Sequence, residues 1–178
     1  MSIDYDDIKH KVYTDELNPD GKYVKEIVEQ MVRKYSKELD EFVDMVRQML
    51  QLVKEATMME YDDESLSMQT IKLPTLLYFA GNGLEDIGSD SEVATYKRKE
   101  LYNEIITNLD TSKYTIPDKK AEAEAATETE AMIEKIYDRA YKKLKLKIEH
   151  GVKLLESLKK IIDLRIAKIN KGKGRDER

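Results

Sequence analysis

The sequence predicts an all-α protein in which two long helices pack as an elongated hairpin or bundle, with two shorter helices between them. Apolar residues recur at steps of three and four over long stretches, which is the spacing of one face of an α-helix. Charged residues make up 38% of the 178 residues and aromatic residues only 7%. Such a composition leaves little material for a thick core and suits long helices that each bury one stripe.

Sequence pattern divides the chain into three parts. Residues 1–19 lead into the turn-forming sequence NPDG, residues 18–21, and are expected to form an N-terminal arm. Residues 20–170 are predicted to form a single elongated helical domain, and the terminal KGKGRDER, residues 171–178, a basic disordered tail. The first ten residues lack the basic and apolar segments of a signal peptide, and no apolar run approaches the ~20 residues of a membrane span. We therefore expect a cytoplasmic protein without membrane partners.

The first long helix is predicted between Lys22 and Met59, where neither glycine nor proline interrupts the pattern. Its apolar stripe consists of Val24, Val28, Met31, Tyr35, Leu39, Phe42, Val46, Met49, Val53 and Ala56.

The sequence LPTLLYFAGNGLEDIG, residues 73–88, differs from its polar surroundings. Pro74 suits the first turn of a helix, and the glycines of the GNG sequence suit a helix end, so a short buried helix is predicted. Ser89 and Glu92 have the spacing of a capping box and are expected to open a second short helix. This helix would run to Leu109 and bury Val93, Leu101, Tyr102, Ile105 and Leu109.

The second long helix is predicted from Asp118 to Ile169, after a linker of about ten residues, with Gly151 as the place for a bend. Its stripe consists of Ile133, Tyr137, Ala140, Leu144, Ile148, Gly151, Leu155, Leu158, Ile162, Ile166 and Ile169. Because the shorter helices cannot cover so long a stripe, we expect the chain to form a homo-oligomer through it.

Charge is distributed unevenly along the chain. Residues 139–178 contain 14 basic and 5 acidic side chains, a local charge of +9, although the whole chain carries −5. A basic end of this kind indicates either an anionic partner or a solvated helix surface.

The sequence gives little support for catalysis. His10 and His150 stand alone, no cysteine is present, and no phosphate-binding loop or strict metal-ligand spacing occurs. We therefore predict a protein that is not an enzyme and that needs no cofactor or metal.

Basic residues interleaved with tyrosines point instead to nucleic-acid binding, since lysines neutralise phosphates and aromatic rings stack on bases. Two sequences carry this pattern, YKRKELY and RAYKKLKLK. The candidate residues are Lys97, Arg98, Lys99, Arg139, Lys142, Lys143, Lys145, Lys147, Lys159 and Lys160, with Arg165 and Lys168 continuing the basic surface. Tyr137 and Tyr141 are assigned to the core instead.

The central segment LLYFAGNGLED resembles the aromatic and Gly-x-Gly motif of UvsY-type phage recombination mediators, and LLESLKKIIDLRIAKI is similar to the terminal helix of that family. The resemblance covers roughly residues 65–170. It implies a phage protein of DNA recombination and repair that binds single-stranded DNA, displaces the single-strand-binding protein and helps load a RecA-type recombinase. Tyr78 and Phe79 correspond to the aromatic pair of the family and are either stacking or core residues. Family members carry basic residues before this pair, whereas this chain has only Lys72 beside it. The phosphate contacts are therefore expected at Lys97–Lys99 or on the terminal helix.

Two other functions remain open at this point. The chain is either this DNA-binding mediator or a structural, scaffolding phage protein whose lysines only keep it soluble. A third alternative is an adaptor that binds a host protein through its acidic N-terminal half.

Overall fold

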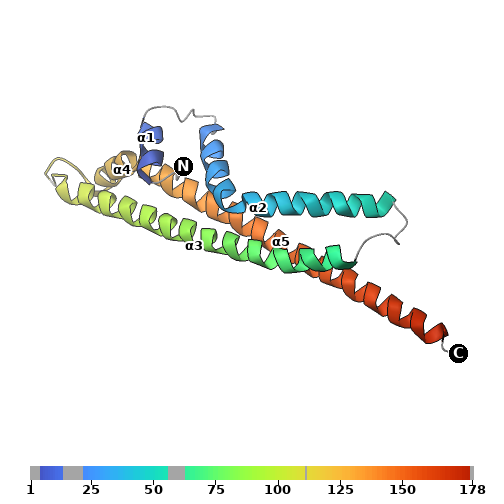
Figure 1. The fold of residues 1–178 in the computed structure, drawn as a ribbon. Helices are drawn as coiled ribbons and strands as arrows, with labels where there is room; N and C mark the ends of the chain where they lie inside the picture. Colours follow the sequence, from blue (N-terminus) through green and yellow to red (C-terminus); the bar gives the residue numbers. More distant parts are fainter. Residues whose placement is uncertain (1–4, 14–21, 56–62, 111, 177–178) are drawn as a thin grey trace. The chain divides into compact units, whose positions relative to one another are not determined.

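The chain is all-helical in the computed structural model, which describes residues 5–13, 22–55, 63–110 and 112–176 (Figure 1). These residues contain α1 (Tyr5–Tyr13), α2 (Lys22–Glu55), α3 (Asp63–Asn108), α4 (Ile116–Ala126) and α5 (Glu128–Asp176), without a strand among them. The predicted all-α class is confirmed. Three helices are long rather than two, since α2, α3 and α5 have 34, 46 and 49 residues.

Helix α3 continues through the central segment, where the sequence predicts a short helix, a stop and a new start. Pro74 lies inside α3, and neither Gly81 nor Ser89 interrupts it, so the predicted boundaries are wrong. The physical reason is a buried stripe that includes small residues: Leu73, Leu76, Ala80, Gly83, Ile87 and Ala94. Packing along this stripe outweighs the ~1 kcal/mol by which each glycine weakens a helix.

The final element, predicted as one helix from Asp118, consists of α4 and α5 with an interruption at Thr127. Helix α4 begins with a capping box in which Asp118 N–H donates to the Thr115 hydroxyl and Thr115 N–H donates to the Asp118 carboxylate. At the interruption, Thr127 Oγ1 donates to the Ala123 carbonyl at 2.8 Å. Helix α5 then extends to Asp176, into the segment predicted as a disordered tail.

The chain packs as two compact units. Unit 1 comprises residues 1–34 and 83–143, and unit 2 comprises residues 35–82 and 144–178. Helices α2, α3 and α5 each contribute residues to both units.

In unit 1, α3 and α5 run antiparallel, with Gly88 against the Tyr141 ring and Arg98 against Glu134 (Figure 1). Helix α1 is held by a fully buried Ile8 and by an ion pair in which Lys9 Nζ lies 3.1 Å from the carboxylate of the buried Glu130. The core of unit 1 includes Ile8, Ile27, Val28, Met31, Val32, Ile87, Ala94, Ala123, Ile133, Ile136, Tyr137 and Ala140.

In unit 2, α2, α3 and α5 meet at Gly151. A Cβ atom at this position would lie 2.6 Å from Leu77 Cδ2 and 3.5 Å from Leu39 Cδ1, so only glycine permits this approach without a shift of Leu77. A polar network stands beside this contact: Lys147 Nζ pairs with the Asp40 carboxylate, which also accepts from the buried Ser36 hydroxyl at 2.9 Å. The core of unit 2 includes Leu39, Phe42, Val46, Leu73, Leu76, Ala80, Leu144 and Leu158.

The predicted stripes are buried over most of their described length, but the stripe of α5 is not covered throughout. Leu158 is 1% exposed, Leu155 and Ile162 are half-buried, and Ile166 is 52% exposed. After Leu158, the stripe residues Ile162 and Ile166 are therefore only partly covered.

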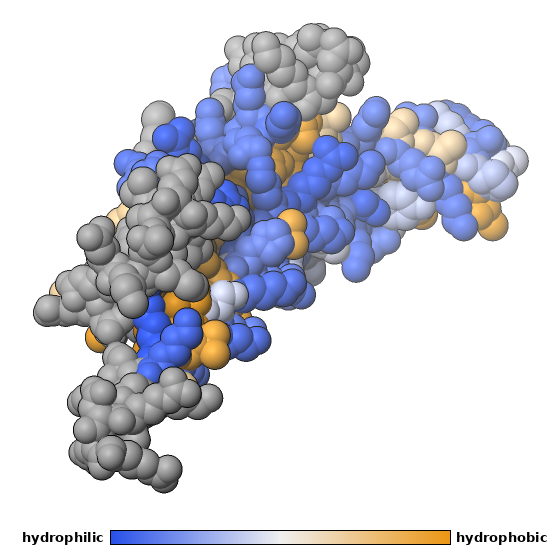
Figure 2. Space-filling view, turned by 90° about the vertical axis from the view of Figure 1, so that its right-hand side faces the viewer, coloured by the Kyte–Doolittle hydropathy of each residue, from blue (hydrophilic) through white to orange (hydrophobic). Residues whose placement is uncertain are grey.

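The described residues visible in Figure 2 form a mostly hydrophilic surface, with hydrophobic residues gathered in separate patches. Among the described helices, none has a stretch long and apolar enough to cross a membrane.

Candidate nucleic-acid interface

The predicted cluster Lys97, Arg98 and Lys99 lies on α3 in unit 1, where contacts within the chain engage two of its three cations. Arg98 Nη1 donates to Glu134 Oε2 at 2.7 Å, and Glu134 also accepts from the Thr95 hydroxyl at 2.8 Å. Lys97 Nζ lies 3.7 Å from the centroid of the Tyr5 ring, in a cation–π contact with α1. Lys99 is exposed. The Glu134 carboxylate neutralises Arg98, so the net positive charge that this cluster offers to a phosphate is smaller than its sequence indicates.

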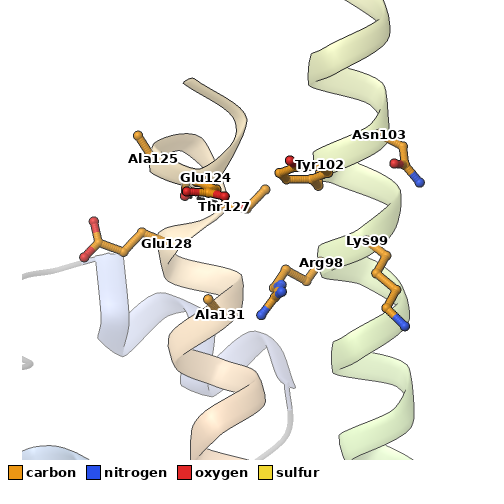
Figure 3. Close-up of a pocket in the computed structure, with 9 residues that line it drawn as sticks. All are labelled: Arg98, Lys99, Tyr102, Asn103, Glu124, Ala125, Thr127, Glu128 and Ala131. Carbon is orange, nitrogen blue, oxygen red and sulfur yellow. Dashed lines mark hydrogen bonds between the residues drawn. The ribbon is translucent and has the colours of Figure 1, made fainter. Parts of the chain in front are cut away.

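A cavity of about 700 Å³ lies next to this cluster, between α3 and the junction of α4 and α5. Figure 3 shows Arg98 and Tyr102 reaching from α3 toward this junction, whereas Lys99 and Asn103 lie on the other side of the helix. The residues that line the cavity are Arg98, Lys99, Tyr102, Asn103, Glu124, Ala125, Thr127, Glu128 and Ala131. Two carboxylates thus accompany the two cations, and Arg98 already pairs with Glu134. This balance of charge does not favour a phosphate.

The second predicted cluster, on α5 in unit 1, is also partly neutralised. Lys142 Nζ lies 2.6 Å from Asp138 Oδ2, one turn earlier on the helix, and Lys143 pairs with Glu29 of α2. Arg139 is exposed. By sequence, unit 1 contains 22 acidic and 16 basic residues, a net charge of −6.

Acidic groups in unit 1 also lie close to each other. The pKa of Asp90 is raised by burial and by the neighbouring Asp86 carboxylate, while Lys34 opposes the shift. The net negative charge of unit 1 and the closeness of its Asp86 and Asp90 carboxylates make it the less favourable unit for a polyanion.

Unit 2 presents its cations differently. Lys147 pairs with Asp40, but five further lysines of α5 are exposed: Lys145, Lys153, Lys159, Lys160 and Lys168. We refer to these five as the α5 lysine row. Within the described part of the chain, no ion pair joins any of them to a carboxylate. From Leu144 to Lys168, α5 carries seven basic and three acidic residues, a net charge of +4.

Lys153 belongs to this row although sequence reasoning missed it. Its signal was the spacing of seven residues to Lys160, which places both lysines on one face of a helix, away from the apolar stripe.

The aromatic residues Tyr78 and Phe79 lie in unit 2 and are 67% and 59% exposed. The two rings form an edge-to-face pair with centroids 5.9 Å apart. A core role for Tyr78 is therefore wrong for the chain by itself. By contrast, Tyr137 is a core residue at 1% exposure, as predicted, and Tyr141 is half-buried against Gly88.

No group of three or more His, Cys, Asp or Glu side chains able to hold a metal ion occurs among the described residues. Comparison with protein families, with characterised proteins and with solved structures finds no match to this chain.

Proposed function

We propose that this protein is a non-catalytic single-stranded DNA-binding protein and that the α5 lysine row provides its phosphate contacts. The observation that carries the proposal is the contrast between cations that pair within the chain and the lysines of the row. The cations Arg98, Lys142, Lys143 and Lys147 pair with carboxylates of the chain, whereas the lysines of the row are exposed and pair with no described carboxylate. Binding a phosphate with an unpaired lysine breaks no ion pair within the protein.

The resemblance to UvsY-type proteins suggests the process in which such DNA binding would act, which is recombination. On that basis the chain acts as a recombination mediator that holds single-stranded DNA while a RecA-type recombinase replaces the single-strand-binding protein. A homo-oligomer would place several lysine rows along one strand, and the exposed Ile166 of the predicted α5 stripe is one candidate contact.

A titration of a fluorescently labelled oligothymidylate at several salt concentrations tests the proposal. If all five lysines contact phosphates, the logarithm of the association constant falls with the logarithm of salt concentration with a slope of about −3.5, at roughly 0.7 per neutralised phosphate. A duplex of the same length is the control, and the single strand is expected to bind more tightly. Absence of binding at low salt, or a slope near zero, would refute the proposal.

A second function, an assembly protein without a nucleic-acid role, is favoured by one specific observation. Glu149, Glu156 and Asp163 are exposed on α5 at four-residue spacing from lysines of the row. Alternating charges of this kind are typical of a solvated helix surface. The same titration separates the two functions, because an assembly protein would show no salt-dependent binding.

A further inference from the structure

Helix α3 exposes large apolar side chains along one side in unit 2. Met68, Ile71, Tyr78 and Phe79 are 64%, 70%, 67% and 59% exposed, and Thr75 lies exposed between them. These five residues, here named the outer α3 face, occupy helical positions opposite the buried stripe of Leu73, Leu76 and Ala80.

This concentration of apolar surface indicates a binding site. Single exposed apolar residues are ordinary on a protein surface and need no explanation. Here four large ones occur within twelve residues of one helix, and two of them are aromatic. Contiguous patches of this kind mark sites of interaction.

The charge of the segment identifies the chemistry of the partner. Between Ser67 and Asn82, Lys72 is the only charged residue. A nucleic acid needs several cations for its phosphates, which this segment does not have. An apolar, nearly neutral helix surface instead fits an apolar surface of a protein.

We infer that the outer α3 face binds the same face of a second copy of this chain. The four large side chains offer on the order of 500 Å² of apolar surface, given the 150–250 Å² of a whole aromatic side chain. A standard interface buries roughly 800 Å² per partner, of which about 65% is apolar in homodimers, so the two areas agree.

The order of residues along the face also suits a two-fold symmetric contact, in which one patch meets itself. Thr75 stands in the middle, with the aliphatic Met68 and Ile71 before it and the aromatic Tyr78 and Phe79 after it. When two copies pair antiparallel about Thr75, the aliphatic half of each meets the aromatic half of the other. The small threonine at the centre lets the two helices approach.

Gly81 gives an independent indication at the same place. Among the described residues, a Cβ atom there would meet no atom within 4 Å outside its own stretch of helix, unlike Gly151, where Leu77 occupies the space. Glycine weakens a helix interior, and no described side chain packs against this one. One turn after Tyr78, it leaves the backbone open to a close approach from outside.

Sedimentation velocity over a range of protein concentrations tests the inference with two matched double variants. Ile71→Asp/Tyr78→Asp places two charges on the outer α3 face, and Leu146→Asp/Leu164→Asp places two charges on exposed positions of α5. The wild type is expected to dimerise. The α3 variant should dimerise at least about 30-fold more weakly, the effect of losing a hot-spot residue, with unchanged helicity by circular dichroism. The α5 variant should retain the dimer.

A cysteine cross-link makes the test independent of these substitutions, because the natural chain has no cysteine. Thr75→Cys is expected to form a disulfide-linked dimer on mild oxidation, since a two-fold axis near residue 75 brings the two sulfur atoms together. Ser157→Cys, exposed on α5, is the control and should remain monomeric in a denaturing gel.

Three results would overturn the inference: a monomeric wild type, a dimer that dissociates only in the α5 variant, or equal cross-linking at both cysteines. A fourth result would also overturn it: a Tyr78→Ala variant that still sediments as the dimer but loses affinity for oligothymidylate. This outcome would assign the outer α3 face to base stacking.

Discussion

Two leucines of α5, six residues apart, should respond very differently to the same substitution. Leu158 is 1% exposed in the core of unit 2, whereas Leu164 is 65% exposed. Changing either one to alanine removes the same atoms from the same helix, so differences in helix propensity cancel. What remains is the difference in burial.

The magnitude follows from the packing around each side chain. Removal of a buried leucine side chain loses its transfer free energy and leaves a cavity, which together lower the free energy of unfolding by about 3 kcal/mol. An exposed leucine should change it by less than about 0.5 kcal/mol. For a chain of this size, about 3 kcal/mol corresponds to a fall in melting temperature of roughly 6–12 °C.

Urea and thermal unfolding followed by circular dichroism at 222 nm measure both values. We expect Leu158→Ala to lower the urea midpoint clearly and Leu164→Ala to leave it nearly unchanged, at all protein concentrations. If Leu164→Ala destabilises the protein as much as Leu158→Ala, the end of α5 is packed against something and our account of unit 2 is incorrect. A loss at Leu164 that grows with protein concentration would place this side chain in a contact between copies of the chain.

Three further predictions concern local contacts. At protein concentrations too low for a dimer, Gly81→Ala should raise the free energy of unfolding by about 1 kcal/mol, because alanine favours a helix more than glycine does. Gly151→Ala should gain less or lose stability, because its Cβ meets a leucine at 2.6 Å. Chemical unfolding of the two variants side by side checks the difference. Asp118→Ala should lower the melting temperature at pH 7, since hydrogen bonds from the Thr115 hydroxyl and N–H lower the pKa of Asp118. A carboxylate whose pKa is lowered by folding stabilises the folded state fully above its unfolded pKa of about 3.9, and this stabilisation is lost as the pH falls through the pKa of the folded state. The melting curves of the wild type and of Asp118→Ala should therefore coincide in strong acid. Asp40→Ala should lower the free energy of unfolding by about 1 kcal/mol in urea titrations, because it removes the acceptor of the buried Ser36 hydroxyl and a partly exposed ion pair; a variant as stable as the wild type would contradict this.

The parts of the fold that follow from large apolar residues at helical spacing could be predicted from the sequence. The stripe of α2 from Val28 to Val46 and the stripe of α5 from Ile133 to Leu158 supply ten of the twenty buried apolar residues in the described part of the chain. Helix α3 could not be predicted in the same way, because its stripe passes through Ala80, Gly83 and Ala94. Those positions become recognisable as core only when the neighbouring helices are in place.

The candidate site shows a different limit of sequence reasoning. A run of cations indicates charge, but the charge available to a ligand depends on carboxylates that are distant in sequence. Lys143 pairs with Glu29, 114 residues away, and Lys147 pairs with Asp40, 107 residues away. Val93, predicted inside, is 47% exposed, since the buried side of α3 is set by the small residues of its stripe. Partners of this kind follow from the packing of helices and not from local spacing.

The most direct test of the central claim is a comparison of two triple variants that remove the same charge. Lys153→Gln, Lys160→Gln and Lys168→Gln together neutralise three lysines of the α5 lysine row. Arg98→Gln, Lys142→Gln and Lys143→Gln together neutralise three cations that are paired within the chain.

The salt dependence of oligothymidylate binding is measured for both variants and for the wild type. Our account predicts that the row variant flattens the slope by about 2, at roughly 0.7 per lost contact, and weakens binding, while the paired variant keeps the wild-type slope. Equal losses in the two variants, or a loss confined to the paired cations, would contradict the assignment of DNA binding to the α5 lysine row.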